Sequence, residues 1–171
     1  ASDVYKRQGI ATEGLSQFED LVSFPCYRWH HSVVVPDGHP LLEKKLITLA
    51  DLAQYSLITY DLGFTGRGHI DDAFKQADIT TDIVLTAMDS DVIQQYVLLN
   101  LGVGIVASMA LQQNGSNGLK VIDASHLFAQ NVTRLAVRRG AYLRQYTYDF
   151  IQQFACLLYT SPSPRDATLS R

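Results

Sequence analysis

The residues with the clearest chemical potential are Thr65 and Arg67, which are flanked by Gly63, Gly66 and Gly68. An apolar, strand-like run ends just before them, and an amphipathic helix begins just after. Glycine lets the backbone approach a ligand closely, and the first turn of a helix offers unpaired amide donors and a positive dipole end. The Thr65 hydroxyl and the Arg67 guanidinium would complete a site for an anion or carboxylate. The alternative is a Thr65 that caps its helix and an Arg67 that is solvated.

Trp29 is the only tryptophan and lies between an apolar segment and the polar pair His30 and His31. An indole at such a boundary can simply cover the edge of a core. Alternatively, it forms the wall of a small-ligand pocket and offers its ring N–H, which only donates, to an acceptor-rich ligand. The residues by themselves leave both interpretations open.

Glycine-rich and serine-containing segments elsewhere do not indicate nucleotide binding or nucleophilic catalysis. Residues 101–108 hold two glycines, but a helical pattern precedes them and a strand pattern follows, the reverse of a dinucleotide-binding turn. We interpret them as a helix stop followed by tight packing. Ser116 lies in the polar loop 114–118 without the spacing of a nucleophile elbow, so we interpret it as a turn residue.

The remaining polar residues do not assemble into a metal site or a catalytic group. The histidines stand at positions 30, 31, 39, 69 and 126. They show neither a helical i, i+4 pair nor the spacing of a zinc site. Asp89 and Asp91 resemble paired acids, but at the start of a predicted helix such residues more often interact with its dipole. We therefore expect no bound metal, no cofactor and no enzymatic activity.

The order of the hydrophobic patterns predicts an α/β fold with a largely parallel sheet, because strands alternate with helices. Strands are expected at residues 8–12, 21–25, 32–35, 57–60, 83–86, 105–107 and 132–137. Helices are expected at residues 48–54, 68–76, 91–101 and 142–154. Thr48 and Asp51 form a predicted capping box, and Ser90 and Gly102 are the predicted start and stop of the third helix.

Composition places the chain among globular, soluble domains. Of its 171 residues, 47% are hydrophobic and 18% are charged, and its net charge is -3. That charge offers no basic surface for nucleic acid. Cys26 and Cys156 are too few for a disulfide framework, which fits a reducing, cytoplasmic compartment, and we expect Cys26 to be buried. The longest apolar run, residues 97–111, falls short of the roughly 20 residues that span a membrane.

Both ends of the chain differ in character from the rest. Residues 2–8 and 157–171 resemble peptides that arise when sequencing-adaptor DNA is translated. We therefore expect residues 1–8 and 156–171 to be non-native and exclude them from the interpretation of the fold.

Seven short motifs, in one register from about residue 10 to 155, resemble the effector-binding domain of CysB-type regulators of the LysR family. They are IATE at 10–13, FPCYRW at 24–29, LAQY at 52–55, GFTGR at 63–67, DSDVI at 89–93, LGVGIVASM at 101–109 and YDFIQ at 148–152. The resemblance implies a periplasmic-binding-protein-like (type 2) α/β fold of two subdomains with a ligand cleft between them. It also implies a ligand such as sulfate, thiosulfate or an acetylserine-type inducer.

Carried over position by position, the ligand contacts of this family match Thr12, Trp29 and Thr65, with Gly66 and Arg67 beside them. The anion site inferred from the residues and the site implied by the family therefore coincide at Thr65.

The resemblance further implies how the chain is divided. We expect a remnant of subdomain I at residues 9–27, a complete subdomain II at 28–131 and a return to subdomain I at 132–155. His30 and His31 stand where the family pattern predicts Asn and Arg, which affects the ligand preference near Trp29.

The same resemblance implies the function of the intact protein. It would control cysteine biosynthesis and sulfur assimilation in the cytoplasm, as a homo-oligomer (a tetramer), without contacting a membrane. DNA would be bound only through a winged helix-turn-helix that is missing from this chain. The alternative function is a periplasmic-type solute-binding protein for a small oxyanion, since such proteins share the fold.

Overall fold

The computed structural model describes residues 8–11, 18–64, 66–111, 118–140, 145–146 and 148–149. The chain divides into two compact units. Unit 1 comprises Ala1–Arg28 and Val132–Arg171, and unit 2 comprises Trp29–Asn131.

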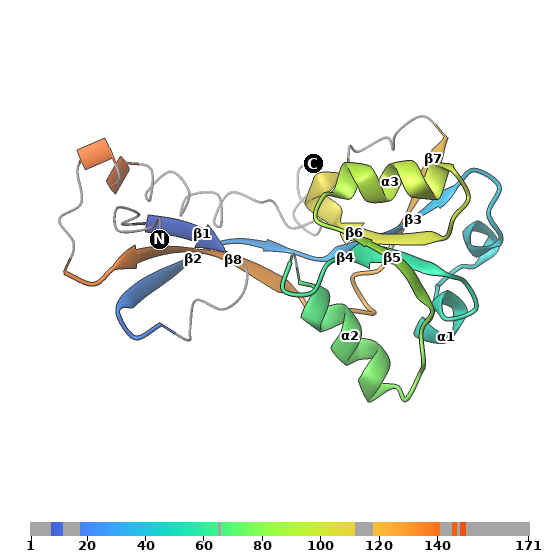
Figure 1. The fold of residues 1–171 in the computed structure, drawn as a ribbon, viewed down its shortest axis with the longest axis horizontal. Coiled ribbons are helices and arrows are strands. Elements are labelled where there is room, and N and C mark those ends of the chain that lie inside the picture. The colour runs from blue at the N-terminus through green and yellow to red at the C-terminus, as the bar shows by residue number, and fades with distance from the viewer. Residues whose placement is uncertain are drawn as a thin grey trace, which may run out of the picture. The chain divides into compact units, whose positions relative to one another are not determined.

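Unit 1 contains a three-stranded sheet in the order β1-β8-β2 (Figure 1). Its strands are β1 (Gln8–Ala11), β2 (Leu21–Trp29) and β8 (Asn131–Arg138). β1 runs antiparallel to β8. Cys26 is 2% exposed and packs with Leu135 and Val137, so the prediction that it is buried is confirmed.

β2 is longer than the predicted strand 21–25 and continues through Pro25 to Trp29. Proline cannot donate a hydrogen bond to a neighbouring strand, and it is therefore tolerated mainly in edge strands. β2 is an edge strand of its sheet, so Pro25 does not end it.

Unit 2 is built on a five-stranded sheet in the order β5-β4-β6-β3-β7. The strands are β3 (His31–Pro36), β4 (Leu57–Tyr60), β5 (Ile83–Ala87), β6 (Val103–Ala107) and β7 (Leu119–Asp123). β4 is parallel to β5 and β6, whereas β3 is antiparallel to β6 and β7. The prediction of a largely parallel sheet is therefore wrong, because only β4, β5 and β6 are joined through crossover helices.

Those crossovers are the two longer helices of the unit. The helices are α1 (Leu49–Leu52), α2 (Arg67–Gln76) and α3 (Ser90–Leu98), together with the 3-10 turns η2 (Pro40–Glu43) and η3 (Ser108–Ala110). α1 starts with the predicted capping box: the Asp51 N–H donates to Thr48 Oγ1 (3.2 Å) and the Thr48 N–H donates to Asp51 Oδ2 (2.9 Å).

The ends of α3 differ by a residue or two from the prediction. Asp89, rather than Ser90, is the N-cap, and its Oδ1 accepts a hydrogen bond from the Asp91 N–H (2.7 Å). At the other end, α3 ends at Leu98, before the predicted stop at Gly102, and Asn100 takes a left-handed conformation with φ of 58°. Asparagine tolerates this conformation better than most residues.

α2 and α3 cover opposite faces of the five-stranded sheet (Figure 1). On β3, Val33 and Val35 pack into the core that contains Ile70 and Phe74 of α2. Val34 between them packs into the core that contains Ile93 and Val97 of α3. Burial on both faces explains why β3 is a continuous apolar run instead of an alternating one.

The sequence analysis did not predict β7, whose residues include Lys120 and Asp123 and are largely exposed. The predicted loop 114–118 lies outside the described residues except for Gly118. Of the predicted helix 142–154, residues 145–146 and 148–149 are described, and they are helical. In the part of the chain that the structure describes, no helix is long and apolar enough to cross a bilayer.

Candidate functional site

The segment between β4 and α2 forms a tight turn. The Phe64 N–H donates to the Asp61 carbonyl (3.1 Å), and the Arg67 N–H donates to the Phe64 carbonyl (2.9 Å). The His69 N–H donates to the carbonyl of Gly66 (3.0 Å). The amides of Arg67 and His69 therefore already have partners, and the start of α2 offers a ligand fewer donors than an open helix end does.

Gly66 is the N-cap of α2, and it has left-handed backbone angles, with φ of 69° and ψ of 18°. Among the residues that the structure describes, no side chain caps the helix at this position. Gly63 also has a positive φ, of 82°. Thr65 lies between them and Thr12 lies in the other unit, and both fall outside the described residues, so their predicted roles as hydroxyl donors remain predictions.

Arg67 is buried, with 7% of its surface exposed. Its Nε donates to Asp71 Oδ1 (2.8 Å), and its Nη1 donates to the carbonyl of Tyr60 (2.5 Å). The interpretation of Arg67 as a solvated residue is therefore wrong. The guanidinium ties the first turn of α2 to the end of β4, and its predicted contact with a ligand is not tested by these bonds.

Trp29 and His31 belong to the interior of unit 2. Trp29 is 2% exposed and packs in the core beneath α3. The ring of His31, which is fully buried, stands edge-on to Trp29 (centroids 5.1 Å apart) and to Phe128 (5.6 Å). Trp29 thus covers a core, while its predicted second role as a ligand donor remains a prediction.

Asn131 connects this aromatic group to the start of α2. Its Nδ2 lies 3.5 Å from Nδ1 of His31. Its side chain also lies against Gly66: a Cβ added there would be 2.8 Å from Cγ of Asn131. A continuous series of contacts therefore runs from Trp29 through His31 and Asn131 to Gly66.

The sequence analysis did not identify Asn131 as a functional residue. A single asparagine just before a predicted strand carries no distinguishing signal, and its contact with Gly66 joins residues far apart in the chain. His31 was noted as a polar neighbour of Trp29 and as a departure from the family pattern, but not as a functional residue.

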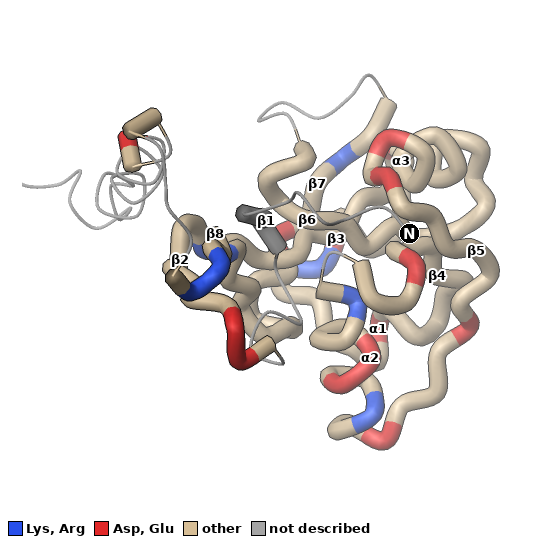
Figure 2. The backbone as a smooth tube through the Cα atoms, turned by 60° about the vertical axis from the view of Figure 1, so that its left-hand side comes forward, with Lys and Arg blue, Asp and Glu red and all other residues tan. Residues whose placement is uncertain are grey.

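Charge does not favour an anion over most of unit 2. The unit contains eleven Asp and Glu residues against five Lys and Arg, and Figure 2 shows the two signs interspersed along α2. The phenol of Tyr60 at the end of β4 accepts a hydrogen bond from the Ala107 N–H (3.1 Å), and burial raises its pKa, so it is neutral at physiological pH. Any anion bound here must rely on local donors.

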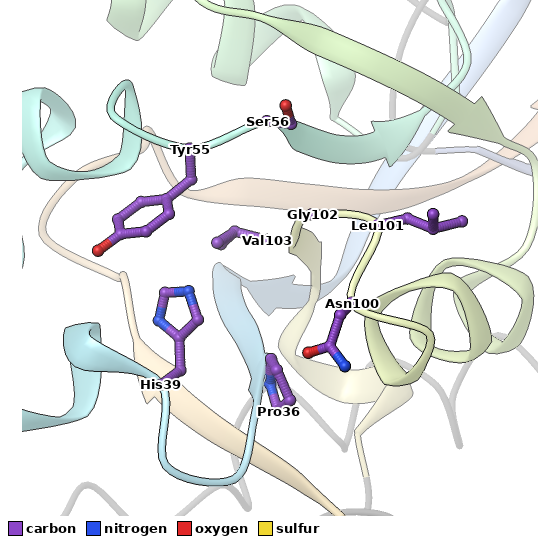
Figure 3. A pocket seen from close by; sticks show the side chains of 8 residues that line it. All are labelled: Pro36, His39, Tyr55, Ser56, Asn100, Leu101, Gly102 and Val103. Atoms are coloured by element: carbon purple, nitrogen blue, oxygen red, sulfur yellow. The ribbon is translucent and has the colours of Figure 1, made fainter.

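A separate cavity of about 240 Å³ lies where β3 ends and β4 and β6 begin (Figure 3). Its lining includes His39, Tyr55 and Asn100. It contains none of the predicted site residues. Within the described residues, no group of three or more His, Cys, Asp or Glu side chains could hold a metal ion.

Comparison with known proteins assigns the chain to a class of domain. Residues 9–157 match the LysR substrate binding domain family, and the chain belongs to that family. The expected type 2 periplasmic-binding-protein-like fold is therefore confirmed.

Three relatives show which branch of the family is involved. The chain is 52% identical to the HTH-type transcriptional regulator SsuR of Burkholderia cenocepacia, over 86% of this chain and 48% of SsuR. It is 54% identical to CysB of the same organism, over 84% of this chain and 46% of CysB. It is 46% identical to cbl of Escherichia coli, over 84% and 46%. The chain thus spans about half the length of these curated relatives, all of them named as regulators and none as an enzyme, and the CysB-type resemblance is confirmed.

Solved structures support the same family assignment. The cofactor-binding domain of the Cbl transcriptional regulator superposes with a TM-score of 0.83 at 44% identity, covering 87% of this chain and 65% of that one. The effector-binding domain of QuiR in complex with shikimate gives a TM-score of 0.73 at 22% identity, covering 89% and 71%. The second likeness shows the shared fold only.

Proposed function

We propose that this chain is the effector-sensing domain of a LysR-type regulator of cysteine biosynthesis and sulfur assimilation. Its ligand is a small anion, such as sulfate or thiosulfate, or an acetylserine-type inducer. Ligand binding biases a conformational equilibrium, and this requires a different affinity for the two states. The relatives named as regulators favour this function over that of a transport-type solute-binding protein.

The observation that carries the proposal is the turn before α2. Gly66 occupies the N-cap in a left-handed conformation, and no described side chain caps the helix there. This is the point where the family resemblance predicts ligand contacts. The positive end of the helix dipole favours an anion there. In the proposed site, Thr65 donates its hydroxyl, Gly66 brings the backbone close, and Arg67 stabilises the turn, with Thr12 and Trp29 as the remaining contacts.

The proposal extends to the arrangement of the intact regulator. We assign residues 28–131 to subdomain II and residues 9–27 and 132–155 to subdomain I. The intact protein is a cytoplasmic homo-oligomer, a tetramer, that binds DNA through a winged helix-turn-helix. The acidic excess of unit 2 supports the assignment of DNA binding to another part of the protein.

The test is calorimetric titration of the chain and its Thr65→Val variant with sulfate, thiosulfate and acetylserine. A hydrogen bond to a charged ligand contributes about 1.5–3 kcal/mol, so the variant should bind the true ligand roughly tenfold to a hundredfold more weakly. Thr80→Val is the matched control, because Thr80 is exposed beyond the other end of α2. Equal affinities of Thr65→Val and the unaltered chain for every ligand would remove Thr65 from the site.

A further inference from the structure

The buried carboxamide of Asn131 contacts the candidate site at Gly66. We infer that Asn131 is a positioning residue, which holds Gly66 and the start of α2 in the conformation that binds the ligand. This inference rests on the function proposed above. It adds to the site a residue that lies outside the sequence motifs, and it implies that a charge at this position would disturb binding.

Gly66 and Asn131 fit together only because glycine has no side chain. A Cβ at Gly66 would lie 2.8 Å from Cγ and 2.9 Å from Nδ2 of Asn131, closer than real Cβ contacts. The hydrogen that Gly66 carries in this direction therefore points at the carboxamide, as in a weak Cα–H contact with a polar group. Asn131 thereby limits how far the turn can move toward the start of β8.

Asn131 is held in turn by the core behind it. Its Nδ2 lies 3.5 Å from Nδ1 of His31, and the His31 ring is fixed edge-on between Trp29 and Phe128, at 73° and 82°. Side chains in a close-packed interior keep a single orientation on average. The N-cap of α2 therefore has a rigid support that extends into the aromatic core.

The unusual atom is Oδ1 of Asn131. It is buried and has no hydrogen-bond partner among the described residues, although Asn131 is 0% exposed. A buried acceptor without a donor costs free energy, and an apolar side chain would avoid that cost, so packing alone does not explain an asparagine here. A neutral carboxamide is polar but does not repel an anion at the neighbouring helix end, whereas a carboxylate of the same shape does.

The sharpest test replaces the neutral carboxamide with a carboxylate of the same shape. The chain and its Asn131→Asp variant are titrated with sulfate at about pH 7.5 and about pH 5, a range in which sulfate keeps its charge. A carboxylate at position 131 would repel an anion bound beside Gly66, so it should weaken sulfate binding roughly tenfold or more at the higher pH. Burial favours protonation of the introduced carboxyl, so most of the loss should disappear at the lower pH. Asn100→Asp is the matched control: Asn100 is exposed at the end of α3, and its variant should bind as the unaltered chain does.

A second pair of variants tests the contact without adding charge. Gly66→Ala should weaken sulfate binding strongly in the unaltered chain. In an Asn131→Ala background the loss should be smaller, because the methyl group has room there and only the strain of a left-handed alanine remains. If Asn131→Asp binds sulfate normally, or if Gly66→Ala has the same effect in both backgrounds, Asn131 does not position the site. Failure of the unaltered chain to bind sulfate, thiosulfate or acetylserine overturns the proposed function, and this inference with it.

Discussion

At the residue scale, Arg67 shows that a cation beside a candidate anion site can belong to the scaffold. Its guanidinium is buried and donates to the Tyr60 carbonyl and to Asp71. A buried guanidinium that donates to two partners on different elements is held rigidly. In our proposal, Arg67 therefore fixes the geometry of the turn, and direct contact with a ligand falls mainly to Thr65.

His39 makes the stability of the protein depend on pH. Burial lowers its pKa below the ordinary value of 6.5, while its Nδ1 accepts a hydrogen bond from the Leu41 N–H (3.2 Å). The unfolded chain therefore binds this proton more readily than the folded chain, and stability is lost as the pH falls below 6.5 toward the folded-state pKa. His39 is the N-cap of η2. The His39→Asn variant keeps a side-chain acceptor at that position but has no group that titrates there.

We expect the melting temperature of the unaltered chain to fall more steeply between about pH 7 and about pH 5 than that of His39→Asn. Differential scanning calorimetry measures both curves, and circular dichroism at neutral pH checks that the variant is folded. The other histidines are common to both proteins, so their contributions cancel. Parallel curves would show that His39 titrates alike in the folded and unfolded chains.

At the residue scale, the sequence predicted the location of residues that are adjacent in the chain. Gly63, Thr65, Gly66 and Arg67 are adjacent, so their common location was predictable from the motif alone. The partners of Arg67 and the contact of Asn131 were not, because both depend on how the start of α2 packs against the end of β4 and against Asn131. Tertiary packing of this kind leaves no periodic signal in the sequence.

At the scale of elements, β6 and α3 are packed closely at Gly104. A Cβ there would lie 2.5 Å from Val34 Cγ2 and 2.8 Å from Val97 Cγ2. The sequence analysis interpreted residues 101–108 as a helix stop followed by tight packing. The tight packing is confirmed at Gly104, whereas α3 already ends at Leu98. The φ of Gly104 is not positive, so its backbone conformation does not require glycine. Glycine is required at this position because a side chain has no space.

Gly104→Ala should therefore lower the free energy of unfolding by about 1–3 kcal/mol, the usual cost of overpacking a core. Gly68→Ala is the matched control, because nothing lies within 4 Å of its added Cβ. Since Gly68 is within α2, alanine there should stabilise by about 0.5–1 kcal/mol. Urea unfolding of both variants measures the difference. An unchanged stability of Gly104→Ala would mean that α3 can shift away from β6 at little cost.

Elements with strong local signals were predicted well. The strand 57–60 was predicted with its observed bounds, and the Thr48 capping box was identified by its two residues. β7 was missed because a strand at the edge of a sheet can be short, exposed and charged. The strand directions were also wrong in part, since pairing between β3, β6 and β7 is decided by the whole sheet and not by each segment.

At the scale of the whole molecule, unit 2 contains all that a folded domain needs. Both of its cores are formed by residues between Trp29 and Asn131, and its sheet is covered on two faces. About 100 residues can bury enough apolar surface for independent stability. We expect a fragment of residues 29–131 to fold on its own.

Such a fragment should show a cooperative thermal transition by circular dichroism and dispersed amide signals by NMR. The control is a fragment of residues 29–111, which lacks β7 and the buried side chains of Leu119, Ala124 and Phe128. It should remain unfolded, because it leaves the edge of β3 unpaired and part of each core empty. A non-cooperative transition in the longer fragment would show that unit 2 depends on unit 1.

The family was predictable from sequence because several motifs in a fixed order are a more specific signal than any single pattern. The individual patterns predicted an α/β fold without distinguishing a regulator from a solute-binding protein. Composition contributed by exclusion: a net charge of -3 argued against direct contact with DNA by this part of the protein.

The chain enters unit 2 at Trp29 and leaves it at Asn131, and contacts through His31 bring these two positions together. A lobe whose two ends lie close together can be treated as an inserted domain. Recombination between related genes can then exchange the lobe as a block, because both of its ends lie at one place on the lobe itself. Chimaeras that graft this block into SsuR or CysB should therefore fold, because the recipient has to supply only two neighbouring chain ends.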